Sequence, residues 1–256
     1  MHLTIWNVIK SFLKGGYVKG DPKNVDDDDH SYIKGDVEDR GPCPGLNALA
    51  NMGYLPRDGK AITLTQTQHA LMTALHMDWL AAASLTATLP PLLHDDGTYD
   101  LVDTRQHNVI EHDSSFTRLD FHQGDNYTFQ RPMLEAMIAD AQKTSVQNTP
   151  AAGSTAVEKP VTLRSLARTF KRRDVESRAA GASRLPLNLW FVRLLQAVGV
   201  MNTAQTGGVL TREVLEAVFV EERFPDVILK NLKPRTVKTL LVDNALGMMR
   251  WVIFGP

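Results

Sequence analysis

Cys43 is the only cysteine in this chain of 256 residues, and it stands between two prolines. Pro42 fixes its own φ angle, and Pro44 restricts Cys43 to extended geometry, so the thiol sits on stiff, non-repetitive backbone. A lone cysteine is commonly a small buried apolar residue. The Pro-Cys-Pro setting favours a thiolate that is presented as a metal ligand, and haem iron accepts one thiolate from one side.

A second group of chemically capable residues is the run Glu111-His112-Asp113-Ser114-Ser115. An imidazole next to carboxylates can transfer protons. Carboxylate, carbonyl and hydroxyl oxygens are the donors that hard cations such as Mg²⁺ or Mn²⁺ prefer. Taken alone, such a run is also typical of an ordinary polar turn.

Composition limits the classes of protein to consider. Hydrophobic residues make up 43% and charged residues 22%, and the net charge is −1. These values are ordinary for a globular domain, and the balanced charge gives no reason to expect a nucleic acid as partner. The sequence contains no apolar run of about 18 residues, the length that would predict a transmembrane span. The N-terminus lacks the continuous apolar core of a signal peptide, and the sequence specifies neither localisation nor oligomeric state.

Helical periodicity dominates the elements that must position these residues. We expect a mainly α fold with long loops and little strand, forming one domain over residues 1–256. Residues 1–35 would be an N-terminal arm, and residues 230–256 a C-terminal tail packed on the domain or extending from it. The predicted helices are 48–52, 65–88, 131–142, 162–180, 187–201 and a final helix that begins at Thr211.

Two charged segments are interpreted as solvent-facing. The acidic run 26–30 reads as a surface loop, because it lacks the alternating ligands of a calcium loop. Helix 162–180 has a basic face that we expect to be solvated. A polar loop is expected over 147–155. His69 and His76 are predicted on one face of helix 65–88, as surface or core residues.

The segment 42–59 closely resembles the proximal segment of the fungal haem-thiolate peroxidases, the family of chloroperoxidases and unspecific peroxygenases. In that family the cysteine of Pro-Cys-Pro is the axial haem ligand. A Leu-Asn-x-Leu-Ala-Asn helix and a Pro-Arg-Asp-Gly turn follow, as at 46–51 and 56–59 here. Residues 111–115 resemble the Glu-His-Asp-x-Ser signature of the family, and 116–126 continue the similarity. A weaker third match is Phe-Val-Glu-Glu-Arg-Phe-Pro at 219–225.

The resemblance implies a haem-thiolate peroxidase-type helical domain that binds haem b through Cys43. It implies a peroxygenase that uses hydrogen peroxide to insert oxygen into small apolar or aromatic organic molecules. The alternatives are a halide-oxidising or one-electron haem peroxidase, or a haem-binding protein with weak turnover. A disulfide-linked dimer is not expected, because it would consume the iron ligand. Backbone N–H groups at the start of the helix should face the thiolate, so we predict that Leu46 and Asn47 lie close to the sulfur.

On the far side of the haem, the resemblance implies an acidic residue assisted by a histidine. His112 matches that histidine, and we expect Asp113 to orient it. The acid departs from the family pattern, because helix 187–201 contains no carboxylate and Gln196 falls near the expected place. Either Glu176 supplies the acid, or His112 works with little help from a carboxylate. A salt-bridged surface residue is an equally good interpretation of Glu176.

The resemblance also implies a divalent cation, Mg²⁺ or Mn²⁺, near a haem propionate. Its ligands here would be Glu111, the carbonyl of His112, and Ser115. Aromatic and aliphatic candidates for the substrate pocket are also suitable for core packing: Phe116, Phe121, Phe191 and Leu195.

Overall fold

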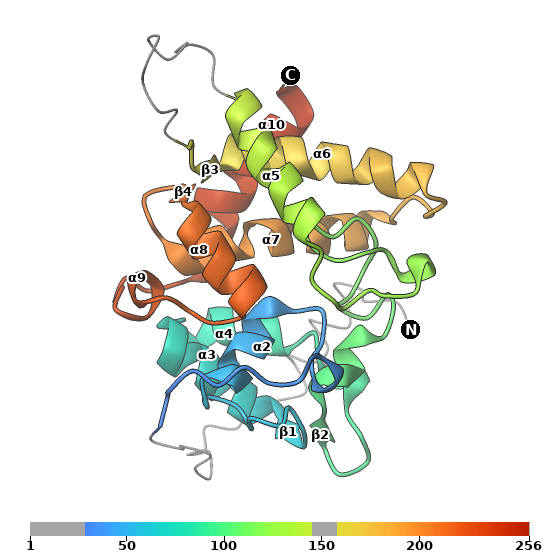
Figure 1. The fold of residues 1–256 in the computed structure, drawn as a ribbon. Coiled ribbons are helices and arrows are strands. Elements are labelled where there is room, and N and C mark those ends of the chain that lie inside the picture. Colours follow the sequence, from blue (N-terminus) through green and yellow to red (C-terminus); the bar gives the residue numbers. More distant parts are fainter. Residues whose placement is uncertain (1–28, 145–157, 256) are drawn as a thin grey trace.

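The computed structural model describes residues 29–144 and 158–255, which fold into a mainly helical molecule (Figure 1). This confirms the predicted fold class. The helices are α2 (Pro44–Asn51), α3 (Leu64–Leu75), α4 (Trp79–Thr86), α5 (Arg131–Thr144), α6 (Leu163–Ala179), α7 (Leu187–Ala204), α8 (Arg212–Glu216), α9 (Asp226–Leu229) and α10 (Leu246–Phe254).

Strand is confined, within the described ranges, to two short antiparallel pairs. β1 (Ile62–Thr63) pairs with β2 (Thr98–Tyr99), and β3 (Val161–Thr162) pairs with β4 (Val209–Leu210). In Figure 1, α2, α3 and α4 lie in the lower half with the first pair, and α7 crosses the middle. Helices α5 and α10 both pack on α6 in the upper half.

The helix that carries the cysteine begins earlier than its periodicity predicts. Helix α2 starts at Pro44 instead of residue 48, and Cys43 is its N-cap residue. Proline is suited to the first helical position, because its φ is already helical and it has no N–H to leave unpaired. The early start brings the N-terminal end of the helix directly to the thiol.

The single helix predicted over 65–88 is wrong, because the chain forms α3 and α4 with a break between them. His76 adopts a left-handed conformation (φ 48°), which ends α3. The Asp78 side chain accepts a hydrogen bond from Ala81 N–H at 2.7 Å and caps α4. Arg235 N–H donates to the His76 carbonyl at 3.1 Å. The Asp78 cap and the contact with Arg235 thus outweigh the helical periodicity. His76 therefore does not lie on the same helix face as His69.

The C-terminal part of the chain contains more helix than expected. The Thr211 side chain caps α8, as predicted, by accepting from Val214 N–H at 3.3 Å. Helix α8 then continues into a π-helical turn, Ala217–Glu221. It is not the final helix, because α9 and α10 follow, and α10 packs on α6.

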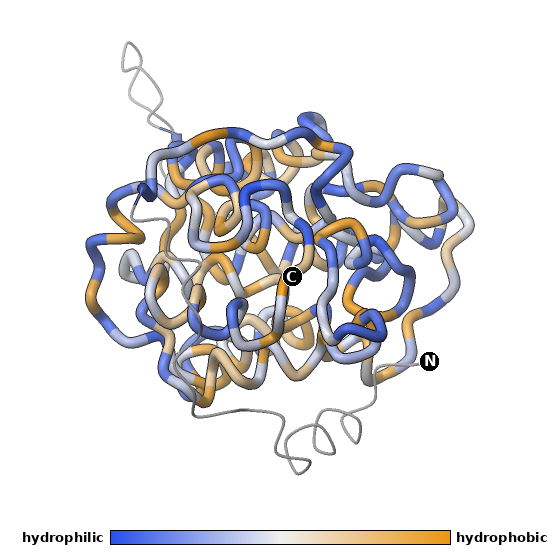
Figure 2. Tube along the Cα trace, turned by 90° about the horizontal axis from the view of Figure 1, so that it is seen from below, coloured by the Kyte–Doolittle hydropathy of each residue, from blue (hydrophilic) through white to orange (hydrophobic). Residues whose placement is uncertain are grey.

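The buried core joins residues from most of the helices, and Figure 2 shows orange, hydrophobic stretches in the coiled segments through the middle of the molecule. Core members include Leu49, Leu71, Leu134, Phe170, Leu194 and Leu215. The basic face of α6 is not wholly solvated, because Arg173 is buried and ion-paired with Asp120 at 3.3 Å. No helix in the described part of the chain combines the length and apolar character needed to cross a membrane.

Three expectations fall wholly or largely outside the described residues. These are most of the N-terminal arm 1–35, most of the acidic run 26–30, and the polar loop 147–155.

The backbone in front of the cysteine is tightly enclosed at Gly41. A Cβ added there would lie 1.9 Å from Thr104 Oγ1 and 2.5 Å from the Leu101 carbonyl oxygen. We expect Gly41→Ala to lower the free energy of unfolding by about 1–3 kcal/mol, as overpacking does. Gly199→Ala in α7 is the control, because no atom lies within 4 Å of its added Cβ. In urea unfolding, the control should have a free energy of unfolding equal to that of the wild type or about 0.5–1 kcal/mol higher. Equal destabilisation of both variants would contradict the prediction.

Candidate functional site

The Cys43 sulfur lies at the N-terminal end of α2. Cys43 has extended backbone (φ −83°, ψ 106°), and its weakly accepting side chain makes no regular capping hydrogen bond. Burial raises the pKa of the thiol, whereas the backbone N–H groups of Leu46 and Gly45 act on the sulfur and lower it. These N–H groups favour the thiolate, as helix N-termini favour anions.

Asn47 holds the cysteine loop against α2. Its backbone N–H donates to the Cys43 carbonyl at 3.1 Å. Its side chain accepts from Gly41 N–H at 3.1 Å and donates to the Gly41 carbonyl at 2.8 Å. Asn47 is almost fully buried, so these bonds fix the turn that carries the sulfur.

The three segments that resemble the peroxidase family meet at Glu222. Its carboxylate Oε1 accepts from Asn47 Nδ2 at 2.8 Å and from the Arg118 guanidinium at 2.9 Å. Its carbonyl accepts from Asn51 Nδ2 at 3.1 Å. Glu222 has a left-handed backbone (φ 54°), uncommon for a residue with a side chain. The tertiary fold thus holds this carboxylate beside the helix that begins after Cys43.

His112 is buried with an oxygen acceptor at each ring nitrogen. Nδ1 lies 2.8 Å from the Asp113 carbonyl oxygen, and Nε2 lies 2.8 Å from Gln196 Oε1. The backbone of Asp113 therefore orients the ring, while its carboxylate accepts from Phe121 N–H at 3.0 Å.

The orientation of the Gln196 amide is fixed by a neighbouring carbonyl. Gln196 Nε2 donates to the Ile110 carbonyl at 2.9 Å, so the amide oxygen must face His112. Only a doubly protonated ring would donate to both acceptors. Burial lowers the pKa of His112, whereas the bonds to Asp113 and Gln196 raise it. Burial prevails, so the pKa lies below its usual range and the neutral ring, with a single proton, is favoured.

Glu176 lies near the C-terminal end of α6 and pairs with two arginines. Its carboxylate is 2.8 Å from Arg172 and 2.9 Å from Arg173. Partial burial raises its pKa, but the hydrogen bonds from these guanidinium groups outweigh it and leave the pKa below its usual range. The pairing favours an ionised carboxylate, and every partner described for the Glu176 carboxylate is an arginine.

Glu111 is brought together with His107 and Asp113, whose ligand atoms all lie within 4.8 Å of one another. Burial raises the pKa of Glu111, and the His107 ring opposes this through a hydrogen bond of 2.7 Å from Nδ1 to the carboxylate. Two carboxylates and an imidazole form a donor set that suits a divalent cation. Ser115 lies in the same loop, and its carbonyl accepts from Arg173 Nε at 2.8 Å.

Two buried arginines brace the loop 111–115. Arg173 binds Ser115 as described, and Arg193 Nε donates to the Ser114 carbonyl at 3.3 Å. Burial lowers the pKa of Arg193 to about 10. Ser114 N–H donates to Asp120 at 2.7 Å, so the loop is held from α6, from α7 and from its own continuation.

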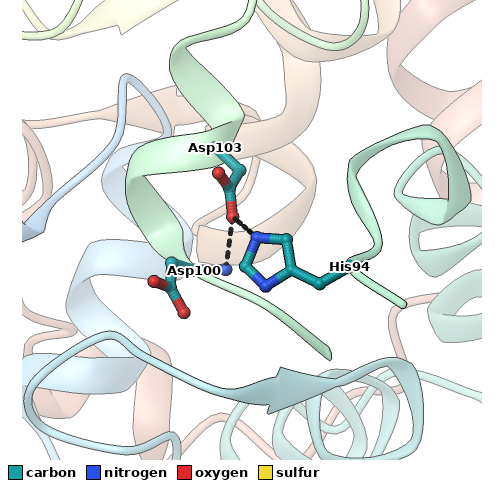
Figure 3. Close-up of side chains that lie close together, drawn as sticks. All are labelled: His94, Asp100 and Asp103. Carbon is teal, nitrogen blue, oxygen red and sulfur yellow. Dashed lines mark hydrogen bonds and ion pairs between the residues drawn. The ribbon is translucent and has the colours of Figure 1, made fainter. Parts of the chain in front are cut away.

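A second cluster of potential metal ligands, His94, Asp100 and Asp103, is explained by local structure (Figure 3). Asp103 accepts from the backbone N–H of Asp100 at 2.7 Å and from the His94 ring at 2.9 Å. Asp100 accepts from Ala61 N–H at 2.8 Å. These bonds cap the 3₁₀ turn Leu101–Arg105 and tie it to the strand pair, so the cluster carries no argument for a metal.

Comparison with known proteins agrees with this geometry. A sequence model of the family described as "Peroxidase, family 2" matches residues 30–237, which contain all three converging segments. The chain belongs to the family 2 peroxidases. This is the haem-thiolate peroxidase and peroxygenase family, as the resemblance of the sequence predicted.

Several fungal members of the peroxidase family share sequence with this chain. An aromatic peroxygenase of Coprinellus radians is 36% identical over 139 residues, covering 46% of this chain and 52% of the relative. A chloroperoxidase of Leptoxyphium fumago is 34% identical over 97 residues, covering 35% of this chain and 26% of the relative. An aromatic peroxygenase of Cyclocybe aegerita is 34% identical over 139 residues, covering 45% of this chain and 36% of the relative. The matched region thus spans about half or less of these curated relatives.

Sequence reasoning missed two residues of the candidate site, His107 and Arg118. His107 is four residues before Glu111, a spacing that could have drawn attention to it. Arg118 lies in the segment 116–126, which resembles the peroxidase family. Its contact with Glu222 joins positions 104 residues apart, so no pattern of neighbouring residues predicts it.

The His107–Glu111 contact gives a testable prediction. His107→Phe keeps a ring that can stack on Phe121 but removes the donor to a buried carboxylate. We expect a loss of about 1–3 kcal/mol in the free energy of unfolding, measured with denaturant at neutral pH. His69→Phe is the control, because His69 is exposed, and it should change stability by less than about 0.5 kcal/mol. A His107 variant as stable as the His69 variant would contradict the prediction.

Proposed function

We propose that this chain is a hydrogen-peroxide-dependent haem-thiolate peroxygenase that inserts oxygen into small apolar or aromatic organic substrates. The observation that carries the proposal is the presentation of Cys43 at the start of α2, with the N–H groups of Gly45 and Leu46 directed to its sulfur. Membership of the peroxidase family supports it. We take residues 1–256 as one domain.

The residues around Cys43 fit a haem b whose iron takes one thiolate. The thiolate would be Cys43, with the backbone of Leu46 and the side chain of Asn47 holding its loop. A thiolate-ligated haem supplies oxidising chemistry with peroxide, because the thiolate pushes electron density toward the opposite position and favours O–O cleavage. The chain's own contribution here is to hold the sulfur at the start of α2, where the N–H groups of Gly45 and Leu46 offset part of the burial that disfavours its charge.

Proton transfer at the opposite side is assigned to His112. Its ring is fixed between the Asp113 carbonyl oxygen and the Gln196 amide oxygen, so each ring nitrogen has an acceptor toward which a proton would be held. Glu176 stays the alternative acid, although its bonds to Arg172 and Arg173 favour the ionised form.

A divalent cation, Mg²⁺ or Mn²⁺, is proposed at the loop 111–115. Glu111 would supply a carboxylate oxygen, with the His112 carbonyl and Ser115 as further oxygen donors. The clustering of Glu111 with Asp113 and His107 supports a cation at this place. Aromatic substrates would find apolar contacts at Phe121, which is half exposed and stacks on His107.

A haem protein with weak turnover is the second candidate. Gln196 favours it, because a neutral amide occupies the position next to His112 where the family resemblance implies an acid. An amide does not donate and accept a proton as a carboxyl group does.

The carbon monoxide difference spectrum of the reduced protein tests the cysteine ligand. The wild type should show a band near 450 nm, the expectation for thiolate ligation, and Cys43→Ala should lose it. His112→Ala is the control and should retain the band, because His112 is not assigned as an iron ligand. A histidine-type spectrum in the wild type, or an unchanged band in Cys43→Ala, would overturn the proposal.

The rate of peroxide activation, followed by stopped flow, tests the proton-transfer residues. Gln196→Glu places a carboxylate beside His112, and we expect it to raise the rate by about 100-fold, the lower end of the range for general acid–base catalysis. Glu176→Gln should leave the rate unchanged. A large loss in Glu176→Gln would assign the acid to Glu176, and no gain in Gln196→Glu would exclude the amide as the limit on turnover.

A further inference from the structure

Arg118 is a buried cation that takes no part in the proposed proton transfer. Its side chain is 2% exposed, and its guanidinium pairs with Glu222 at 2.9 Å. Its Nε atom is buried and has no hydrogen-bond partner among the described residues. A guanidinium stays protonated in proteins, so a full positive charge is held inside the molecule.

The ion pair is linked to the cysteine by a short series of contacts. Glu222 Oε1 accepts from both Arg118 and Asn47, and Asn47 N–H donates to the Cys43 carbonyl. Burial is the largest influence on the pKa of the thiol and of the guanidinium. The Arg118 charge also lowers the pKa of the Cys43 thiol, and Glu222 raises it. The two charges of the pair therefore act on the sulfur with opposite sign.

We propose that Arg118 and Glu222 are positioning residues whose opposed charges set how strongly the Cys43 thiolate donates electrons to a bound iron. The proposal rests on the proposed haem-thiolate function. A charge acts strongly on a buried neighbour because little water screens it. Reduction of the iron adds negative charge beside the thiolate, so Arg118 favours the reduced state and Glu222 disfavours it. Such charge and hydrogen-bond partners around a metal ligand are a general way to tune a metal site.

The Fe(III)/Fe(II) reduction potential of the haem-loaded protein tests this inference. Glu222→Gln keeps an oxygen acceptor for Asn47 and removes only the negative charge, so the potential should rise. Arg118→Gln should lower it. We expect about a tenfold change in the equilibrium constant for each, equal to about 59 mV for one electron. The double variant should return close to the wild-type value, because it removes both charges.

The variants also separate charge from structural disturbance. Loosening of the cysteine loop would move both single variants in the same direction, whereas the charge effect moves them in opposite directions. Arg118→Lys keeps the charge and should stay near the wild-type potential. Arg131→Gln and Glu216→Gln break an ion pair elsewhere in the molecule and should not shift the potential.

Each outcome decides the matter. Opposite shifts with recovery in the double variant support the inference. Shifts of the same sign, or none in Glu222→Gln, overturn it. If Arg118→Gln does not fold, a raised potential in Glu222→Gln with no change in Arg118→Lys supports the same conclusion. A wild type with the 450 nm band but unmoved potentials in the variants overturns this inference alone. A wild type without that band overturns the proposed function as well.

Discussion

The site depends on the contact between the Cys43 sulfur and the start of α2. Burial opposes a charged thiolate, and the N–H groups of Gly45 and Leu46 offset part of that cost. This geometry requires the helix to begin at Pro44, directly after the cysteine. Asn47 then secures the loop from behind, and Glu222 brings in the distant segments that complete the surroundings of the sulfur. Residues far apart in the chain therefore hold one cysteine loop in place.

The two halves of the site differ in how closely they follow the family pattern. Around Cys43, the three family-like segments converge on one network of hydrogen bonds. Around His112, the imidazole is held firmly, but its partner is the amide of Gln196 rather than a carboxylate. The surroundings of Cys43 thus follow the family pattern, whereas those of His112 depart from it at Gln196.

Local signals predicted the parts of the structure that local physics controls. The start of α8 at Thr211, the short helix after Cys43 and the mainly helical class all follow from residues close in sequence. The break between α3 and α4 was missed because the Asp78 cap and the distant Arg235 contact outweigh a continuous apolar pattern. The Arg118–Glu222 pair and the burial of Arg173 depend on partners on other elements, which no window of sequence reveals.

The central claim is that Cys43 supplies a thiolate to iron, and X-ray absorption at the iron edge of the haem-loaded protein tests it most directly. The account predicts one sulfur scatterer in the first coordination shell of the wild type, and its loss in Cys43→Ala. A first shell made only of nitrogen and oxygen in the wild type would contradict the account.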